Sequence, residues 1–120
     1  VTLAGPSAYA VDELAAADVV ALSSNWEGSP IVAAEALQLG RPLVSTDVGD
    51  VAEVVESGVS GWLVAVGDEA AFGSALLASV VDPDNAERMG SEGLVRAGVK
   101  YDPEKLVDEV CAVYSKVVGR

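Results

Sequence analysis

Histidine is absent from this sequence and cysteine occurs once, and these absences exclude several kinds of site. Without histidine there is no Ser-His-Asp triad, no histidine general base and no histidine metal ligand. A single cysteine, Cys111, can form no disulfide within the chain and no CxxC zinc or redox motif. Its apolar neighbours predict a buried, inert thiol.

Basic residues are also scarce, with seven against 19 acidic residues and a net charge of −12. This charge argues against binding to nucleic acid or to an anionic membrane surface. Residues 1–60 contain nine acidic side chains and one basic side chain, Arg41. An anionic ligand bound by this half must therefore rely on backbone N–H groups or on cations from elsewhere.

Long apolar runs are missing as well. No stretch reaches the roughly 18–20 apolar residues that would span a bilayer, and no signal peptide opens the sequence. We therefore expect a cytoplasmic location, with any peripheral membrane contact made by a part outside this chain.

What the sequence does contain is a high share of apolar residues, 51% of 120, which is enough for one domain with a real core. Short apolar runs alternate with amphipathic segments. They predict strands at 1–4, 18–23, 42–46 and 61–64, and helices at 11–17, 29–39, 50–57, 68–81, 82–99 and 102–118.

Several polar residues and glycines mark the predicted helix ends. Ser29 is the expected N-cap of the 29–39 helix, with Pro30 in its first turn and Gly40 beyond its end. An Asp50/Glu53 pair is expected to cap the 50–57 helix. Asp68, Asp82 and Asp102 are expected to cap the three later helices, and Gly90 and Gly93 to loosen the second of these.

Buried strands joined by helices predict an α/β fold, namely a partial Rossmann-like parallel sheet with helical crossovers and C-terminal helices. Ligands on such sheets bind outside the carboxyl ends of the strands. The turns after Ser23, Thr46 and Val64 are therefore the places to look for a site.

The turn after Ser23 runs directly into a helix. The free N–H groups of Ile31 and Val32 would lie at its N-terminus, the positive end of the helix dipole, which suits a phosphate. Gly28 allows close approach of a ligand to the backbone. Glu27 lies on the turn and Glu35 one helical turn after Ile31, so two carboxylates would flank this position. Such a layout fits a nucleotide sugar, with its diphosphate over the helix start and its hydroxyls donating to the carboxylates.

Residues 27–35, EGSPIVAAE, resemble the E-x7-E motif of retaining GT-B glycosyltransferases, the glycogen-synthase-like "group 1" family. The flanking segments agree in order: AADVVALSS before the motif, then ALQLGRPLV, then TDVG, EVV and GVSGWLV. The resemblance covers nearly the whole chain, and this ordered set is far more specific than two glutamates alone.

The resemblance implies a role for each of these residues. Glu27 would contact the donor sugar as the catalytic residue, and Glu35 would accept hydrogen bonds from the nucleotide ribose. The donor diphosphate or sugar would contact Gly28, Ser29, Pro30, Ile31 and Val32. The reaction would transfer a hexosyl unit with retention, with a nucleotide-diphosphate sugar as donor substrate, no cofactor and no metal.

Two departures from the family pattern stand out. Gly49-Asp50 occupies the place of a frequent Gly-Gly, which adds a side chain and a negative charge. The family's paired Arg and Lys phosphate ligands would lie upstream of residue 1. We therefore expect residues 1–120 to be a single fragment of a nucleotide-sugar-binding Rossmann-like domain, lacking its first strands and the N-terminal acceptor domain. Alone, it would be inactive and could self-associate through exposed sheet edges.

Other interpretations of the sequence remain open. A sugar-nucleotide epimerase of GT-B-like fold would also bind a nucleotide sugar, and a non-catalytic binding module would need no chemistry. Trp26 and Trp62 are interpreted as packing residues rather than sugar platforms. Asp82-Pro83-Asp84 spells a D-x-D metal motif, but its position favours a helix cap.

Overall fold

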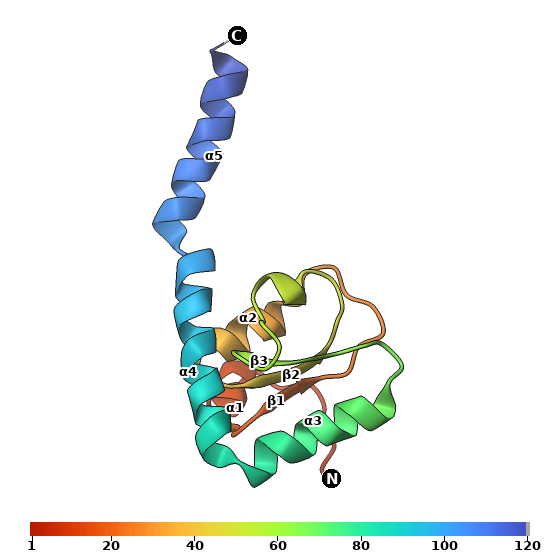
Figure 1. Cartoon of the computed structure of the whole chain (residues 1–120). Helices are drawn as coiled ribbons and strands as arrows, with labels where there is room; N and C mark the ends of the chain where they lie inside the picture. The colour runs from red at the N-terminus through yellow and green to blue at the C-terminus, as the bar shows by residue number, and fades with distance from the viewer. Residues whose placement is uncertain (120) are drawn as a thin grey trace.

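The computed structural model describes residues 1–119, and its centre is a three-stranded parallel sheet (Figure 1). The strands are β1 (Val20–Leu22), β2 (Leu43–Thr46) and β3 (Gly61–Val64), and they lie in the order β1-β2-β3. α2 (Ile31–Gln38) connects the first two. The predicted α/β class with parallel strands and helical crossovers is confirmed.

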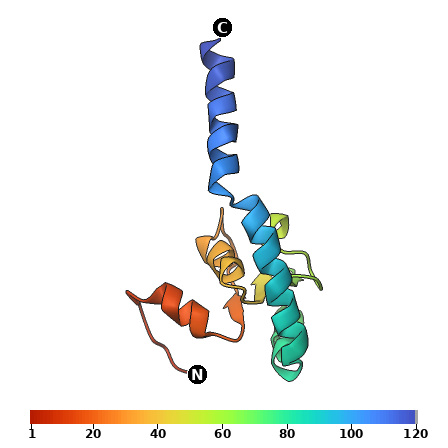
Figure 2. The ribbon, with the colours of Figure 1, turned by 90° about the vertical axis from the view of Figure 1, so that its left-hand side faces the viewer.

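The remaining helices differ in how they meet the sheet. They are α1 (Ala10–Ala16), α3 (Glu69–Val81), α4 (Pro83–Lys100) and α5 (Pro103–Val118). α2 and α4 pack together on one face, and α3 packs on the other face against β2 and β3. α5 projects away from this body, which gives the molecule extents of 56 × 30 × 28 Å (Figures 1 and 2).

Successive residues of β2 supply the two parts of the core, because alternate side chains of a strand point to opposite faces. Leu43 belongs to the larger cluster between the sheet and α2, and Val44 belongs to the smaller one under α3. Leu37, Leu43, Val44, Val51 and Val55 are among the largest fully buried side chains. Trp62 is partly buried against the smaller cluster, as predicted.

α4 approaches α2 closely because glycines face its neighbours. A Cβ at Gly90 would lie 2.1 Å from the carbonyl oxygen of Gly40, and one at Gly93 would lie 2.6 Å from a methyl group of Leu37. These glycines do not loosen the helix, contrary to expectation, since α4 runs unbroken from Pro83 to Lys100. Their small size is what allows the two helices to touch.

Two predicted elements are wrong. Residues 1–4 form no strand within the described chain and are fully exposed, because no neighbouring strand satisfies their backbone groups. The predicted 50–57 helix is only a 3₁₀ turn, η1 (Val51–Glu53). Val51, Val54 and Val55 are drawn into the core there, and the Ser60 hydroxyl accepts from the N–H of Glu56 at 2.9 Å in place of a helical carbonyl.

Three of the predicted helix caps are confirmed and two are wrong. The side chains of Asp68, Asp82 and Asp102 each accept a hydrogen bond from a backbone N–H two or three residues ahead, as expected. At α2, however, Pro30 and not Ser29 is the N-cap residue, with no side-chain cap. Asp50 also makes no side-chain cap for η1.

Two side chains predicted to be buried are exposed. Trp26 is 82% exposed on the turn after β1. Cys111 is exposed on α5 because that helix packs against nothing in the described chain that would bury it.

Candidate functional site

The three turns at the carboxyl edge of the sheet are joined by hydrogen bonds. At the end of β2, the Thr46 hydroxyl donates to the carbonyl oxygens of Ser24 at 2.6 Å and of Leu22 at 3.3 Å. The N–H of Asp47 donates to the carbonyl oxygen of Val64 at 2.8 Å. β2, the central strand, therefore ties the turn after β1 and the turn after β3 to one edge.

Glu27 lies on the turn after β1 and is held there by Ser24. The Ser24 hydroxyl donates to Oε1 of Glu27 at 2.7 Å, in a partly buried setting. Because Thr46 in turn fixes the Ser24 carbonyl, two hydroxyl groups orient the carboxylate. No cation among residues 1–119 pairs with Glu27, so its second carboxylate oxygen is open to other donors.

The start of α2 leaves two backbone N–H groups without protein acceptors. Ala33 is the first residue of the helix whose N–H bonds back, to the carbonyl of Pro30 at 3.0 Å. Within the described residues, the N–H groups of Ile31 and Val32 bond to no carbonyl, and no side chain caps them. Ile31 is 73% exposed, and the first turn contains no acidic residue. Free N–H groups at a positive helix end suit an anion.

Ser29, which was predicted to cap α2, instead joins the turn after β1 to the turn after β2. Its hydroxyl donates to Oδ2 of Asp50 at 2.8 Å, and the N–H of Asp50 donates to the carbonyl oxygen of Gly28 at 3.2 Å. Gly49 has a φ of 56°, and a Cβ there would lie 2.1 Å from that same carbonyl oxygen. Only glycine fits at position 49 while the two turns remain in contact.

Glu35 lies on α2 one turn beyond Ile31 and is half-buried. It forms no side-chain hydrogen bond or ion pair with the described residues. The structure thus places one carboxylate before the helix start and one after it, as predicted, without a hydrogen bond between the two. Their predicted roles toward a ligand stay predictions.

The structure brings two cations toward the turn after β2 that sequence reasoning missed. From the second half of α4, Arg96 pairs with Glu56 and Lys100 pairs with Glu53. The hydrogen bond with Glu53 raises the pKa of Lys100, and burial raises the pKa of Tyr101. No local signal marks these pairs, because the partners lie 40 and 47 residues apart in the sequence.

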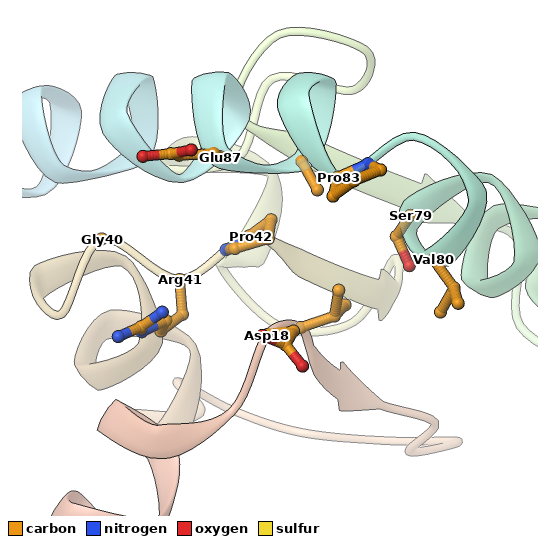
Figure 3. Close-up of a pocket in the computed structure, with 10 residues that line it drawn as sticks. Asp18, Gly40, Arg41, Pro42, Ser79, Val80, Pro83 and Glu87 are labelled. Carbon is orange, nitrogen blue, oxygen red and sulfur yellow. The ribbon is translucent and has the colours of Figure 1, made fainter.

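Two cavities lie at opposite edges of the sheet. One of about 380 Å³ is at the carboxyl edge, lined by Ser23, Asn25, Thr46, Gly67 and Phe72 among others. Another of about 460 Å³ is at the amino edge, where Arg41 and Pro42 precede β2 and Pro83 begins α4 (Figure 3). Ligands of parallel sheets bind at the carboxyl edge, so the first of these adjoins the candidate site.

Metal-binding clusters and membrane-spanning helices are both absent from residues 1–119. These residues contain no group of three His, Cys, Asp or Glu side chains arranged to hold a metal ion. Within the same range, no helix is long and apolar enough to cross a membrane.

Comparison with known protein families identifies this arrangement. Residues 1–82 match the family model described as "Glycosyl transferases group 1". The chain belongs to the group 1 glycosyltransferases. Among its relatives in this family, the α-maltose-1-phosphate synthase of Mycobacterium tuberculosis is 34% identical over 110 residues, which is 87% of this chain. The D-inositol 3-phosphate glycosyltransferase of Nocardia farcinica is 38% identical over 82 residues, 68% of the chain.

Solved structures of glycosyltransferases share the fold. Anabaena HepE, solved in complex with UDP, superposes on 87% of this chain with a TM-score of 0.81 and 26% identity. The sucrose-phosphate synthase of Thermosynechococcus elongatus superposes on 89% with a TM-score of 0.83 and 26% identity. The chain therefore has a GT-B-type Rossmann-like fold. It spans 28% of the length of the maltose-1-phosphate synthase and 29% of that of HepE.

Proposed function

We propose that this chain is the nucleotide-sugar-binding part of a retaining glycosyltransferase that transfers a hexosyl unit to an acceptor. The observation that carries the proposal is the uncapped start of α2, where the N–H groups of Ile31 and Val32 are free between Glu27 and Glu35. Family membership supports it, as do the HepE structures in complex with UDP and with UDP-glucose.

The start of α2 would receive the donor diphosphate. When the bond between the sugar and the diphosphate breaks, negative charge grows on the leaving phosphate. Backbone N–H groups that already point at that position stabilise the charge without reorganising, which lowers the barrier. At Gly28 even an added Cβ would meet nothing within 4 Å, so a ligand has room to approach the backbone there.

The two glutamates would bind the two ends of the donor. Glu27 is oriented by Ser24, so its free oxygen can accept from hydroxyl groups of the transferred sugar and hold the anomeric carbon toward the acceptor. Glu35, half-buried and without a protein partner in the described residues, can accept from the ribose hydroxyls. Hydrogen bonds to charged acceptors of this kind contribute about 1.5–3 kcal/mol each.

Further cations and the acceptor site would lie outside these residues. Arg96 and Lys100 already pair with Glu56 and Glu53, so they are not free to neutralise a diphosphate. We therefore propose that the 120-residue chain does not catalyse transfer alone. The complete enzyme would consist of the chain together with the acceptor domain and phosphate-binding cations.

The test of donor binding is calorimetric titration of the complete enzyme with nucleoside diphosphates and their hexose derivatives. Glu35→Ala should weaken nucleoside diphosphate binding by about tenfold or more, because it removes the charged acceptor for ribose. Glu92→Ala, an exposed glutamate on α4, is the matched control and should leave the dissociation constant unchanged. If no nucleotide binds the unmodified complete enzyme, the proposal is wrong.

The role of Glu27 is tested by activity. Glu27→Gln keeps the hydrogen-bonding shape but removes the charge, and it should lower kcat by about a hundredfold or more while the nucleoside diphosphate still binds. Chromatography of the products distinguishes a glycoside from an epimerised nucleotide sugar. An epimer without glycoside would show that the complete enzyme is not a transferase.

A further inference from the structure

Asp50 directly contacts the turn after β1, which leads into α2. The family that the sequence resembles often has glycine at this position. Its carboxylate accepts from the Ser29 hydroxyl at 2.8 Å, and its N–H reaches the carbonyl oxygen of Gly28 at 3.2 Å. Both partners lie in the turn that leads into α2. Asp50 is therefore fixed beside the helix start by two separate contacts, one through its side chain and one through its backbone.

The charge of Asp50 is not neutralised by the contact that fixes it. A hydroxyl donor orients a carboxylate but carries no net charge, and no cation among residues 1–119 pairs with Asp50. Lys100 of α4 pairs with Glu53, and the charge of Asp50 also helps to raise the pKa of Lys100, so this ammonium offsets part of the charge of Asp50. Asp50 is only partly buried, so its charge is screened by solvent but still felt at short range.

We propose that Asp50 is a specificity-determining residue of the donor site, whose negative charge favours an uncharged hexose over an anionic uronate on the same nucleoside diphosphate. This inference rests on the proposed function, because it places the donor sugar beside the Gly28–Ser29 turn. The two donors differ only at C6, where one has a hydroxymethyl group and the other a carboxylate. A fixed carboxylate next to the turn repels the second and leaves the first unaffected.

Screening by solvent limits how strongly Asp50 can discriminate between the hexose donor and the uronate donor. Two charges near a protein surface interact only weakly once screening by solvent and salt is included. Removing the charge of Asp50 should therefore narrow the preference for the hexose over the uronate by about threefold to fivefold. The preference in the unmodified enzyme should also shrink as the salt concentration rises from about 0.02 M to about 0.5 M, because the Debye length falls.

Two variants separate the charge from the hydrogen bond. Asp50→Asn removes the charge but retains an oxygen that can accept from Ser29. Ser29→Ala removes the hydrogen bond but retains the charge. Asp84→Asn on α4 is the control carboxylate, since α4 begins at the amino edge of the sheet, away from this turn.

The measurement is the ratio of dissociation constants for the two nucleotide donors, taken by competition calorimetry on the complete enzyme at low and high salt. In Asp50→Asn we expect a smaller ratio that depends less on salt than in the unmodified enzyme. Ser29→Ala should change both affinities by the same factor and leave the ratio as it was. Asp84→Asn should change neither affinity.

Three results would overturn the inference, and they differ from one another. An unchanged ratio in Asp50→Asn with intact donor binding rejects the role of Asp50 and leaves the donor site standing. An equal loss of discrimination in Ser29→Ala assigns the effect to the hydrogen bond rather than the charge. Absence of binding of both donors to the unmodified enzyme rejects the proposed function itself.

Discussion

α4 and α5 follow each other in the chain and are similar in length, but one face of α4 is buried and α5 is exposed on all sides. Ala86, Met89, Gly90, Gly93 and Ala97 of α4 are buried against the body of the molecule. No residue of α5 is buried, although Leu106, Val110, Tyr114 and Val117 form the continuous apolar face that its spacing predicts.

The difference shows that apolar content alone does not bury a helix. Leu94, Val95 and Val99 of α4 are exposed, whereas alanines and glycines make most of its buried face. Small side chains let α4 lie almost on the backbone of its neighbours, and tight contact of this kind contributes dispersion and excludes water. α5 has the apolar stripe but lacks a surface in the described chain that matches it.

The largest expected contrast is in amide hydrogen exchange. Interior amides of α4, such as those of residues 89–97, should exchange at least about a hundredfold more slowly than those of α5, because opening α4 disrupts the core. A helix of 16 residues without packed neighbours is marginal in water. Mass-spectrometric exchange of the 120-residue chain measures this. Equal protection of both helices would mean that α5 is covered in solution.

The next largest difference between the two helices should be in stability, when one apolar side chain on each helix is truncated. Met89→Ala should lower the free energy of unfolding by about 3 kcal/mol, because Met89 is only 3% exposed and its loss leaves a cavity. Leu106→Ala, at a residue 61% exposed, should change it by less than about 0.5 kcal/mol. Urea denaturation measures both, and a large loss in Leu106→Ala contradicts the comparison.

Two glycines within α4 test whether close approach is the reason for burial. Gly90→Ala should cost about 2 kcal/mol, since the added Cβ would meet the Gly40 carbonyl at 2.1 Å and the backbone must shift. Gly98→Ala is the matched control, with nothing within 4 Å of its Cβ position. It should stabilise the helix by up to about 1 kcal/mol. Opposite signs in thermal denaturation are the expected result; the same sign would reject this explanation.

The smallest effect is electrostatic and concerns the end of α4. The pKa of Lys100 is raised above its ordinary value of 10.5, chiefly by the hydrogen bond with Glu53. A raised pKa means that the stabilisation is fully present below about pH 10 and is lost as the pH rises through the folded-state pKa. Glu53 is 67% exposed and Lys100 is 29% exposed, so solvent screens the pair and the contribution is about a few tenths of a kcal/mol.

A variant pair measures this contribution. Glu53→Gln should lower the melting temperature slightly at about pH 8, and the difference from the unmodified chain should shrink as the pH rises through the raised pKa of Lys100. Glu109→Gln is the comparison on α5, where Lys105 and Glu109 are 3.9 Å apart in an i,i+4 pair. A pH-independent effect of Glu53→Gln would show that its charge is not responsible.

What could be predicted from the sequence is what depends on neighbours close along the chain. The apolar runs at β1, β2 and β3 identify buried strands, and aspartates 68, 82 and 102 cap helices through N–H groups two or three residues away. Residues 27–35 form a contiguous motif that ends on α2, so the position of both glutamates relative to the helix start also follows from the sequence.

What could not be predicted depends on contacts between distant segments. Ser29 has the right residue type for a helix cap, but Asp50, 21 residues later, takes its hydroxyl. The 50–57 segment has the residue types of a capped helix, but its valines are drawn into the core formed by the sheet and α2. The approach of Lys100 to Glu53 follows from the packing of α4, which glycine spacing alone does not specify.

The contact between Gly49 and Gly28 also has a consequence for the order in which the molecule forms. Thr46 is the last residue of β2, and Gly49 and Asp50 lie in the turn that follows it. All three residues contact the turn after β1. Until β2 has docked beside β1, that turn lacks these contacts and keeps only its internal hydrogen bond from Ser24 to Glu27. The chain should therefore bind a nucleotide only after the two strands have paired. Nucleotide binding during refolding would then mark a late step of folding.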